Sequence, residues 1–140
     1  MTKLLPLTAA VIAGAVLAGS ASAAPRDDWS SQANKVCTIY VAKAKQLFAK
    51  PVQPSGLYKF AKDVKTLETS EFNALNAIPG RSSAGDHAML ALRGDIGMVV
   101  SAIKAWDAGN KATFVKDLKA YLNSTKPKVA FAAAGASKCG

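Results

Sequence analysis

Few side chains in this sequence could do redox, metal or acid–base chemistry. The thiols are Cys37 and Cys139, and the single histidine is His87. Catalytic dithiols usually lie in Cys-x-x-Cys, where one thiol is activated and the other resolves, whereas these cysteines lie far apart in the sequence. A zinc site needs three or four ligands, which two sulfurs and one imidazole do not supply. We therefore expect neither a redox pair nor a metal centre, and no cofactor.

The two glutamates of the chain are Glu68 and Glu71, three residues apart. This spacing places ligands on one helix face in di-iron bundles, but those sites need four carboxylates and paired Glu-x-x-His motifs, which are absent here. We expect both acids to be solvated partners of lysines such as Lys65. Glu71 is the one acidic interruption that we identify in an apolar seam, so a buried polar contact is expected there first.

His87 follows Asp86 at the start of a predicted helix. A general base needs a partner and a positioned substrate, and a haem ligand needs a deep apolar pocket, so His87 is interpreted as a partly exposed helix-start residue. The chain carries no glycine-rich phosphate loop, serine-nucleophile motif or nucleic-acid-binding motif. These observations favour a protein that is not an enzyme and has no nucleic-acid partner.

Apolar residues recur at steps of three and four along most of the chain, which is the period of an amphipathic helix. Pro51, Pro79-Gly80 and Gly109 mark the breaks between the periodic segments. The pattern predicts four helices, over residues 29–50, 54–78, 84–108 and 111–134. Because short links favour neighbouring antiparallel helices, the predicted fold is all-α, a four-helix up-down-up-down antiparallel bundle.

Two glycines and one proline lie well inside the predicted helices, where these residue types are unfavourable. Gly94 and Gly97 each cost a helix about 1 kcal/mol relative to alanine, which suggests that a neighbouring group packs closely there. Pro127 lacks a backbone donor and is expected to bend the last helix.

The core of such a bundle is where a pocket for an apolar ligand would form. We predict that such a cavity, if the helices leave one, is lined by Met89, Ile96, Val99, Phe114 and Tyr121. The alternative for the same residues is plain core packing.

The first 23 residues are predicted to be a signal peptide. Met1-Thr2-Lys3 is a short positive start, residues 4–18 are apolar and uncharged, and Ala21-Ser22-Ala23 is a small-x-small cleavage pattern. The apolar run spans about 22 Å as a helix, short of a ~30 Å hydrocarbon core. We expect cleavage near Ala23, one domain over residues 24–140, and a product that is secreted or held in the cell envelope and is not transmembrane.

The predicted topology and the export signal both bear on the cysteines. Cys37 lies near the start of the first predicted helix and Cys139 follows the end of the fourth. In a bundle with an even number of alternating helices, these two ends of the chain arrive at the same pole. Since disulfides form and persist in oxidising compartments, we predict a Cys37–Cys139 disulfide.

The chain is basic, with 18 Lys and Arg against 9 Asp and Glu and a formal net charge of +9. This balance favours loose attraction to anionic surfaces. The lysines are dispersed over the predicted helices, and only three arginines are present, so most of the charge is interpreted as a solvated polar exterior.

These features lead to one preferred function and two alternatives. We expect a non-enzymatic envelope or secreted protein that binds another macromolecule, such as another envelope protein, through its helix faces, with the disulfide keeping it folded outside the cell. The first alternative is a carrier of a small apolar ligand in the bundle core. The second is electrostatic attachment to anionic wall polymer or lipid headgroups.

Four short stretches resemble a loose family of small exported or lipid-anchored helical proteins of actinobacteria. The stretches are Ala33-Asn34-Lys35-Val36-Cys37, Leu75-Asn76-Ala77-Ile78-Pro79, Asp107-Ala108-Gly109-Asn110 and Ser137-Lys138-Cys139-Gly140. Proteins of this family are similar to this chain in having a cysteine within the first helix and a C-terminal Cys-Gly. It carries no assigned activity, so the resemblance implies no functional residues. This chain differs from the lipid-anchored members because no cysteine follows the signal sequence directly.

Overall fold

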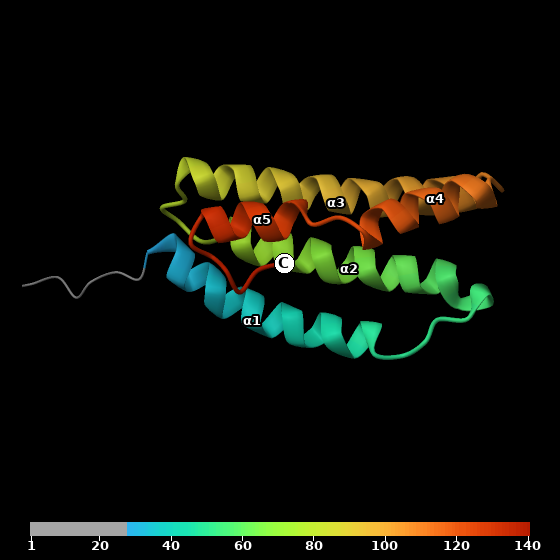
Figure 1. Cartoon of the computed structure of the whole chain (residues 1–140), viewed down its shortest axis with the longest axis horizontal. Coiled ribbons are helices and arrows are strands. Elements are labelled where there is room, and N and C mark those ends of the chain that lie inside the picture. The colour runs from blue at the N-terminus through green and yellow to red at the C-terminus, as the bar shows by residue number, and fades with distance from the viewer. Residues whose placement is uncertain (1–27) are drawn as a thin grey trace, which may run out of the picture.

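The computed structural model describes residues 28–140, and this part of the chain is all-α (Figure 1). The helices, in chain order, are α1 (Trp29–Phe48), the 3-10 helix η1 (Pro54–Gly56), α2 (Leu57–Asn76), α3 (Ser83–Asp107), α4 (Lys111–Leu122) and α5 (Lys126–Ala133). The predicted signal peptide and its cleavage site lie outside the described residues. No helix within residues 28–140 is long and apolar enough to cross a membrane.

Local capping signals explain where α1, α3 and α4 begin. The side chains of Asp28, Ser82 and Asn110 each accept a hydrogen bond from a backbone N–H in the first turn of the helix that follows, which satisfies a donor that has no partner within the helix. Gly80 and Gly109 take positive φ in the links before α3 and α4, a backbone conformation that favours glycine.

The predicted fourth helix is two helices, which corrects the expectation of one helix over residues 111–134. α4 ends at Leu122 and α5 begins at Lys126. Pro127 lies in the first turn of α5, where its missing N–H costs nothing, so the chain breaks ahead of the proline instead of bending through it. Both pieces pack against α3 and run antiparallel to it, so together they form the fourth arm of the bundle (Figure 1).

The bundle is open on one side. α1 packs against α2, while the pairs α2–α3, α3–α4 and α3–α5 supply the other main helix contacts. Figure 1 shows α1 and the α4–α5 arm on either side of α2, with the C-terminal tail folded into the space between α1 and α5. The described part of the chain is therefore an up-down-up-down arrangement whose first and fourth arms do not close on one another along their full length.

The buried apolar side chains form two separate clusters. The first lies beneath the start of α1 and contains Trp29, Ala33, Cys37, Leu75, Ala88, Met89, Leu92, Phe131, Ala136 and Cys139. The second lies between α2, α3 and α4 and contains Phe60, Ala61, Val64, Val99, Ala102, Phe114, Leu118 and Tyr121. A single apolar seam runs along each of α2 and α3. Side chains that are not apolar must therefore interrupt both seams between the two clusters.

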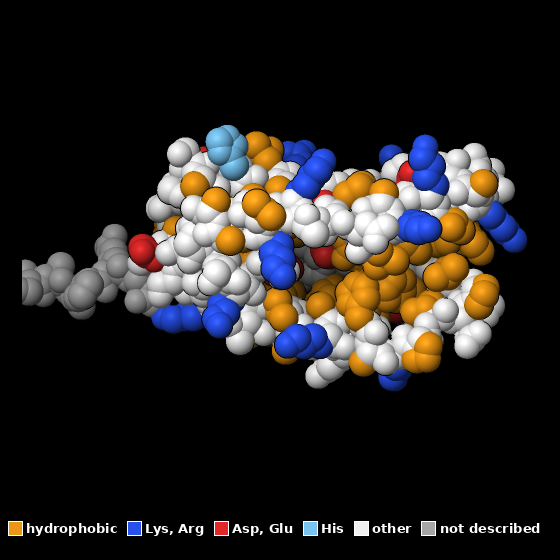
Figure 2. Space-filling view, viewed as in Figure 1, with side chains coloured by type: hydrophobic (Ala, Val, Ile, Leu, Met, Phe, Trp, Pro, Cys, Tyr) orange, Lys and Arg blue, Asp and Glu red, His pale blue; other side chains and the backbone are white. Residues whose placement is uncertain are grey.

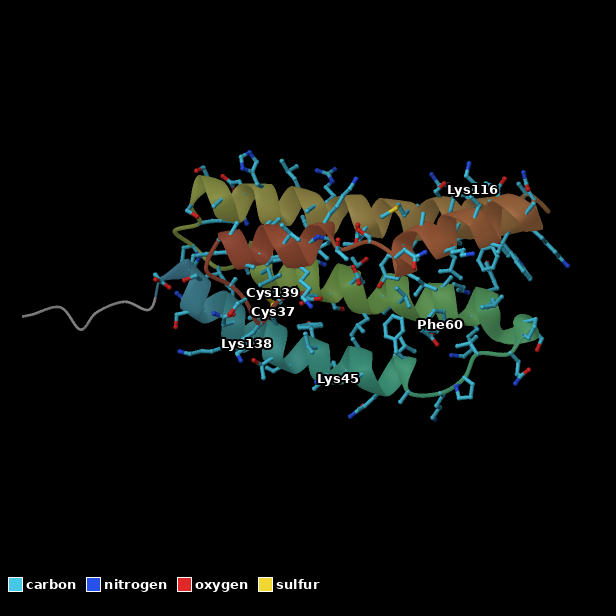
Figure 3. The ribbon with its side chains drawn as sticks, viewed as in Figure 1. Cys37, Lys45, Phe60, Lys116, Lys138 and Cys139 are labelled. Atoms are coloured by element: carbon cyan, nitrogen blue, oxygen red, sulfur yellow. A yellow bond between two sulfur atoms is a disulfide. The ribbon has the colours of Figure 1, made fainter. Side chains whose placement is uncertain are left out.

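Cys37 and Cys139 form the predicted disulfide, with Cα atoms 4.9 Å apart (Figure 3). Asn34 also holds the tail: its Nδ2 donates to the Gly135 carbonyl at 3.2 Å, and its Oδ1 accepts from the Lys138 N–H at 2.8 Å. The tail thus returns from the end of α5 to the middle of the molecule. The disulfide and these hydrogen bonds fix it between α1 and α5.

The expected close packing at Gly94 and Gly97 is absent. A Cβ built on either glycine would meet no heavy atom within 4 Å, and both residues are exposed. The crowded glycines lie elsewhere. A Cβ on Gly140 would come within 2.5 Å of the Lys128 Cα, and Gly140 has a φ of +94°, so only glycine fits where the tail meets α5.

Candidate functional site

A cavity of about 270 Å³ opens on the unclosed side of the bundle. Its lining residues come from every helix and from the tail: Ala44, Phe48, Glu68, Glu71, Leu92, Asp95, Tyr121, Leu122, Ser124, Thr125, Pro127, Lys128, Phe131 and Gly140. Figure 2 shows this face hollowed between α1 and the α4–α5 arm, with hydrophobic side chains gathered in the hollow and acidic side chains at its inner end. The volume is slightly below the range of small-molecule pockets, which span roughly 300–1,000 Å³.

The apolar wall of the cavity includes side chains that water reaches. Phe48 and Leu122 are 45% and 49% exposed, and the Phe48 ring meets Phe60 edge-on at 5.3 Å between centroids. Figure 3 labels Phe60 near the start of α2. A ligand that covered Phe48 and Leu122 would gain the free energy of burying their apolar surface.

Three carboxyl groups line the inner part of the cavity: Glu68 and Glu71 from α2 and Asp95 from α3. They interrupt the two helix seams at the same level. On α2 the seam runs from Val64 through both glutamates to Leu75 at steps of four, three and four, and on α3 Asp95 lies three residues after Leu92 and four before Val99. These acids are the polar layer that separates the two apolar clusters.

Two hydroxyl groups donate hydrogen bonds to carboxyl groups of this polar layer. The Tyr121 hydroxyl donates to Glu68 Oε1 at 2.6 Å, and the Ser124 hydroxyl donates to Asp95 Oδ1 at 2.8 Å. The Oε2 atom of Glu68 is buried and accepts no hydrogen bond from the described residues. A buried acceptor without a donor costs about 1–3 kcal/mol, so the layer is not fully satisfied by the protein itself.

Burial raises the pKa of each of these carboxyl groups, because it disfavours the charged form. The pKa of Glu71 rises to about 7, with repulsion from Glu68 adding to the effect of burial. The pKa of Glu68 is also raised by burial, against the opposing hydrogen bond from Tyr121. The pKa of Asp95 is raised by burial, although Ser124 and the charge of Lys126 oppose the rise.

The positive groups near this layer are Lys126, which acts on Asp95, and Lys128, which lines the cavity. The same burial, together with the charges of Glu68, Asp95 and Glu71, raises the pKa of the Tyr121 hydroxyl. Tyr121 therefore stays a neutral donor near pH 7. No group of three or more His, Cys, Asp or Glu side chains in residues 28–140 is arranged to hold a metal ion.

Of the five residues predicted to line a cavity, Tyr121 lines this one. Met89 is buried in the first cluster and borders a second, more open hollow of about 330 Å³ beside Phe72 and Arg93. Ile96 packs against the first cluster, while Val99 and Phe114 are buried in the second. The structure thus places these other four in core packing and does not bring them to the cavity, because their side chains point between helices that are in contact.

Glu71, where a buried polar contact was expected first, is partly buried in the seam and lines the cavity. The expectation of a solvated Glu68–Glu71 pair was wrong. Both acids are partly buried. Asp95, 5% exposed, was missed. The signal for Asp95 and Glu68 was present in the sequence, since each takes a seam position between apolar residues. His87 is exposed at the start of α3, away from this cavity.

Comparison of the chain with protein-family models, with curated proteins and with solved structures finds no match. The resemblance to small exported actinobacterial proteins stays a prediction.

Proposed function

We propose that the protein is an exported, non-enzymatic binding protein that carries a small, largely apolar molecule in the cavity between α1 and the α4–α5 arm. Two features support export. The N-terminal sequence has the pattern of a signal peptide, and the Cys37–Cys139 disulfide is the state expected in an oxidising compartment.

The observation that carries the proposal is the cavity itself. It combines an apolar wall, including Phe48, Leu122 and Phe131, with polar groups that converge at its inner end, which is the general character of a small-molecule site. This geometry favours the carrier over the macromolecule-binding protein preferred from sequence, because the hollow is concave and is built by all the helices. Electrostatic attachment to wall polymer or lipid headgroups stays a separate prediction from the net charge.

A binding experiment with an apolar reporter dye tests the proposal. N-phenyl-1-naphthylamine is uncharged at neutral pH and fluoresces in apolar sites, so we expect saturable binding to the oxidised protein. Ala44 lines the cavity and Ala42 is exposed on the same helix. Ala44→Trp should fill the cavity and abolish dye binding, whereas the matched control Ala42→Trp should bind as the wild type does.

Absence of saturable dye binding, or equal loss in both variants, would overturn the carrier proposal. Native mass spectrometry gives an independent test on protein purified from its own producing cells. A carrier should retain a defined adduct that is lost in Ala44→Trp.

A further inference from the structure

We propose that the molecule held in this cavity carries a positive charge, as a protonated amine on an apolar body. The amine would lie against Glu68, Glu71 and Asp95, and the apolar body would extend along Phe48 and Leu122 toward the mouth. This inference rests on the proposed carrier function and adds the chemical class of the ligand.

Hydrogen-bond acceptors outnumber donors among the polar groups that line the cavity. Three carboxyl groups present six oxygen atoms there, and the hydroxyl groups of Tyr121 and Ser124 satisfy one oxygen each. An alkylammonium supplies three N–H donors and no acceptor. The site is short of hydrogen-bond donors and the ammonium group has no acceptor, so the two are complementary.

The Oε2 atom of Glu68 is buried and still accepts no hydrogen bond from the described residues. Its partner oxygen, Oε1, already accepts from Tyr121. A donor at Oε2 must therefore come from outside the described protein groups. A charged donor makes a stronger hydrogen bond to a carboxylate than a neutral one does, so an ammonium relieves this acceptor more than a hydroxyl would.

The charged groups that face the carboxyl layer are mainly acidic. Facing the layer are Glu68, Glu71, Asp95 and the neutral Tyr121, with Lys126 and Lys128 as the positive groups from α5. Acids outnumber lysines there, although the chain as a whole is basic. An organic cation also uses the apolar wall, and the acids are not arranged for a metal ion among the described residues.

Binding of an amine should be coupled to proton release. Glu71 has a pKa raised to about 7 by burial and by Glu68, so part of its population is protonated at neutral pH. A nearby ammonium favours the ionised form, which lowers that pKa and expels the proton. Affinity should therefore fall as the pH is lowered from 7.5 to 5, a range in which a primary alkylamine itself stays charged.

The test compares three probes with the same alkyl chain: octylammonium, octanol and octanoate. Isothermal titration of the full, oxidised protein at pH 7.5 should show octylammonium binding about tenfold or more tightly than octanol, with octanoate weakest. Titration in two buffers of different ionisation enthalpy should show proton release for octylammonium alone. Octanol or octanoate binding as tightly as octylammonium would overturn the inference.

Variants separate the carboxyl layer from general effects of charge. Glu68→Gln and Glu71→Gln keep the side-chain shape and should bring octylammonium close to octanol in affinity. The matched control is Asp63→Asn, an acid on α2 whose side chain is 41% exposed beside Lys59 and which should leave the preference unchanged. Lys128→Met should strengthen octylammonium binding, and weaker binding in this variant would contradict the assignment.

The two proposals fail in different ways. If the neutral dye does not bind, the carrier function is wrong and the inference falls with it. If the dye binds and is displaced by octanol or octanoate as readily as by octylammonium, the carrier function stands and the charge of the ligand is wrong.

Discussion

The partly buried carboxyl group of Glu71 makes the stability of the fold depend on pH. An ordinary glutamate ionises near pH 4.5, and burial with the charge of Glu68 raises the pKa of Glu71 to about 7. Between these values the folded protein holds a proton that the unfolded chain has released. The free energy of unfolding that depends on this group is therefore fully present below pH 4.5 and is lost as the pH rises to about 7. Glu68 and Asp95, whose pKa values are also raised by burial, act in the same direction.

Glu71→Gln removes this titration. We expect the variant to show a flatter dependence of stability on pH between 4.5 and 7, and to exceed the wild type at pH 8 by about 1–3 kcal/mol, since one pKa unit corresponds to about 1.4 kcal/mol. Urea denaturation across this pH range measures the effect. Asp63→Asn, at an exposed acid of the same helix, should leave the pH profile unaltered. A Glu71→Gln protein less stable than the wild type at pH 8 would show that the ionised carboxylate is favourably held.

At the scale of the elements, the sequence predicts what is encoded locally. Apolar periodicity and capping residues predict α1, α2 and α3 to within a few residues, because these signals act within one helix. The break between α4 and α5 required a choice between bending at Pro127 and stopping before it. That choice depends on how both pieces pack against α3, a tertiary contact that periodicity does not report.

The glycines of α3 offer a test of element-scale energetics. Gly94→Ala and Gly97→Ala should each stabilise the protein by about 0.5–1 kcal/mol, because alanine is the better helix former and neither Cβ would meet another atom within 4 Å. Thermal and urea denaturation measure the gain. Gly85→Ala is the contrasting variant, since its Cβ would lie 3.2 Å from the Trp29 ring and 2.5 Å from the Arg81 Cγ. We expect it to destabilise, and a stabilised Gly85→Ala would contradict the packing at the start of α3.

At the scale of the whole molecule, the site is less predictable than the fold. Glu71 and Tyr121 could be singled out from sequence, because one interrupts a seam and the other lies in one. The cavity itself arises because α1 and the α4–α5 arm do not close and because the tail returns between them. Both features depend on how segments that are far apart in the sequence lie relative to one another in space. No helical period carries that information, so Met89 and Phe114 were as good candidates from sequence as the residues that line the cavity.

The disulfide joins the stability of the molecule to the shape of its cavity. It links residues 102 apart in sequence and keeps Gly140, which lines the cavity, against Lys128. Replacing both cysteines by serine should lower the free energy of unfolding by about 2–4 kcal/mol, measured by urea denaturation. Dye affinity should fall several-fold as the tail detaches.

Asn34→Ala is the control, because it removes two hydrogen bonds to the tail and leaves the covalent link. It should cost about 1–2 kcal/mol and keep dye binding. Full dye affinity in the cysteine double variant would show that the tail is not a wall of the site.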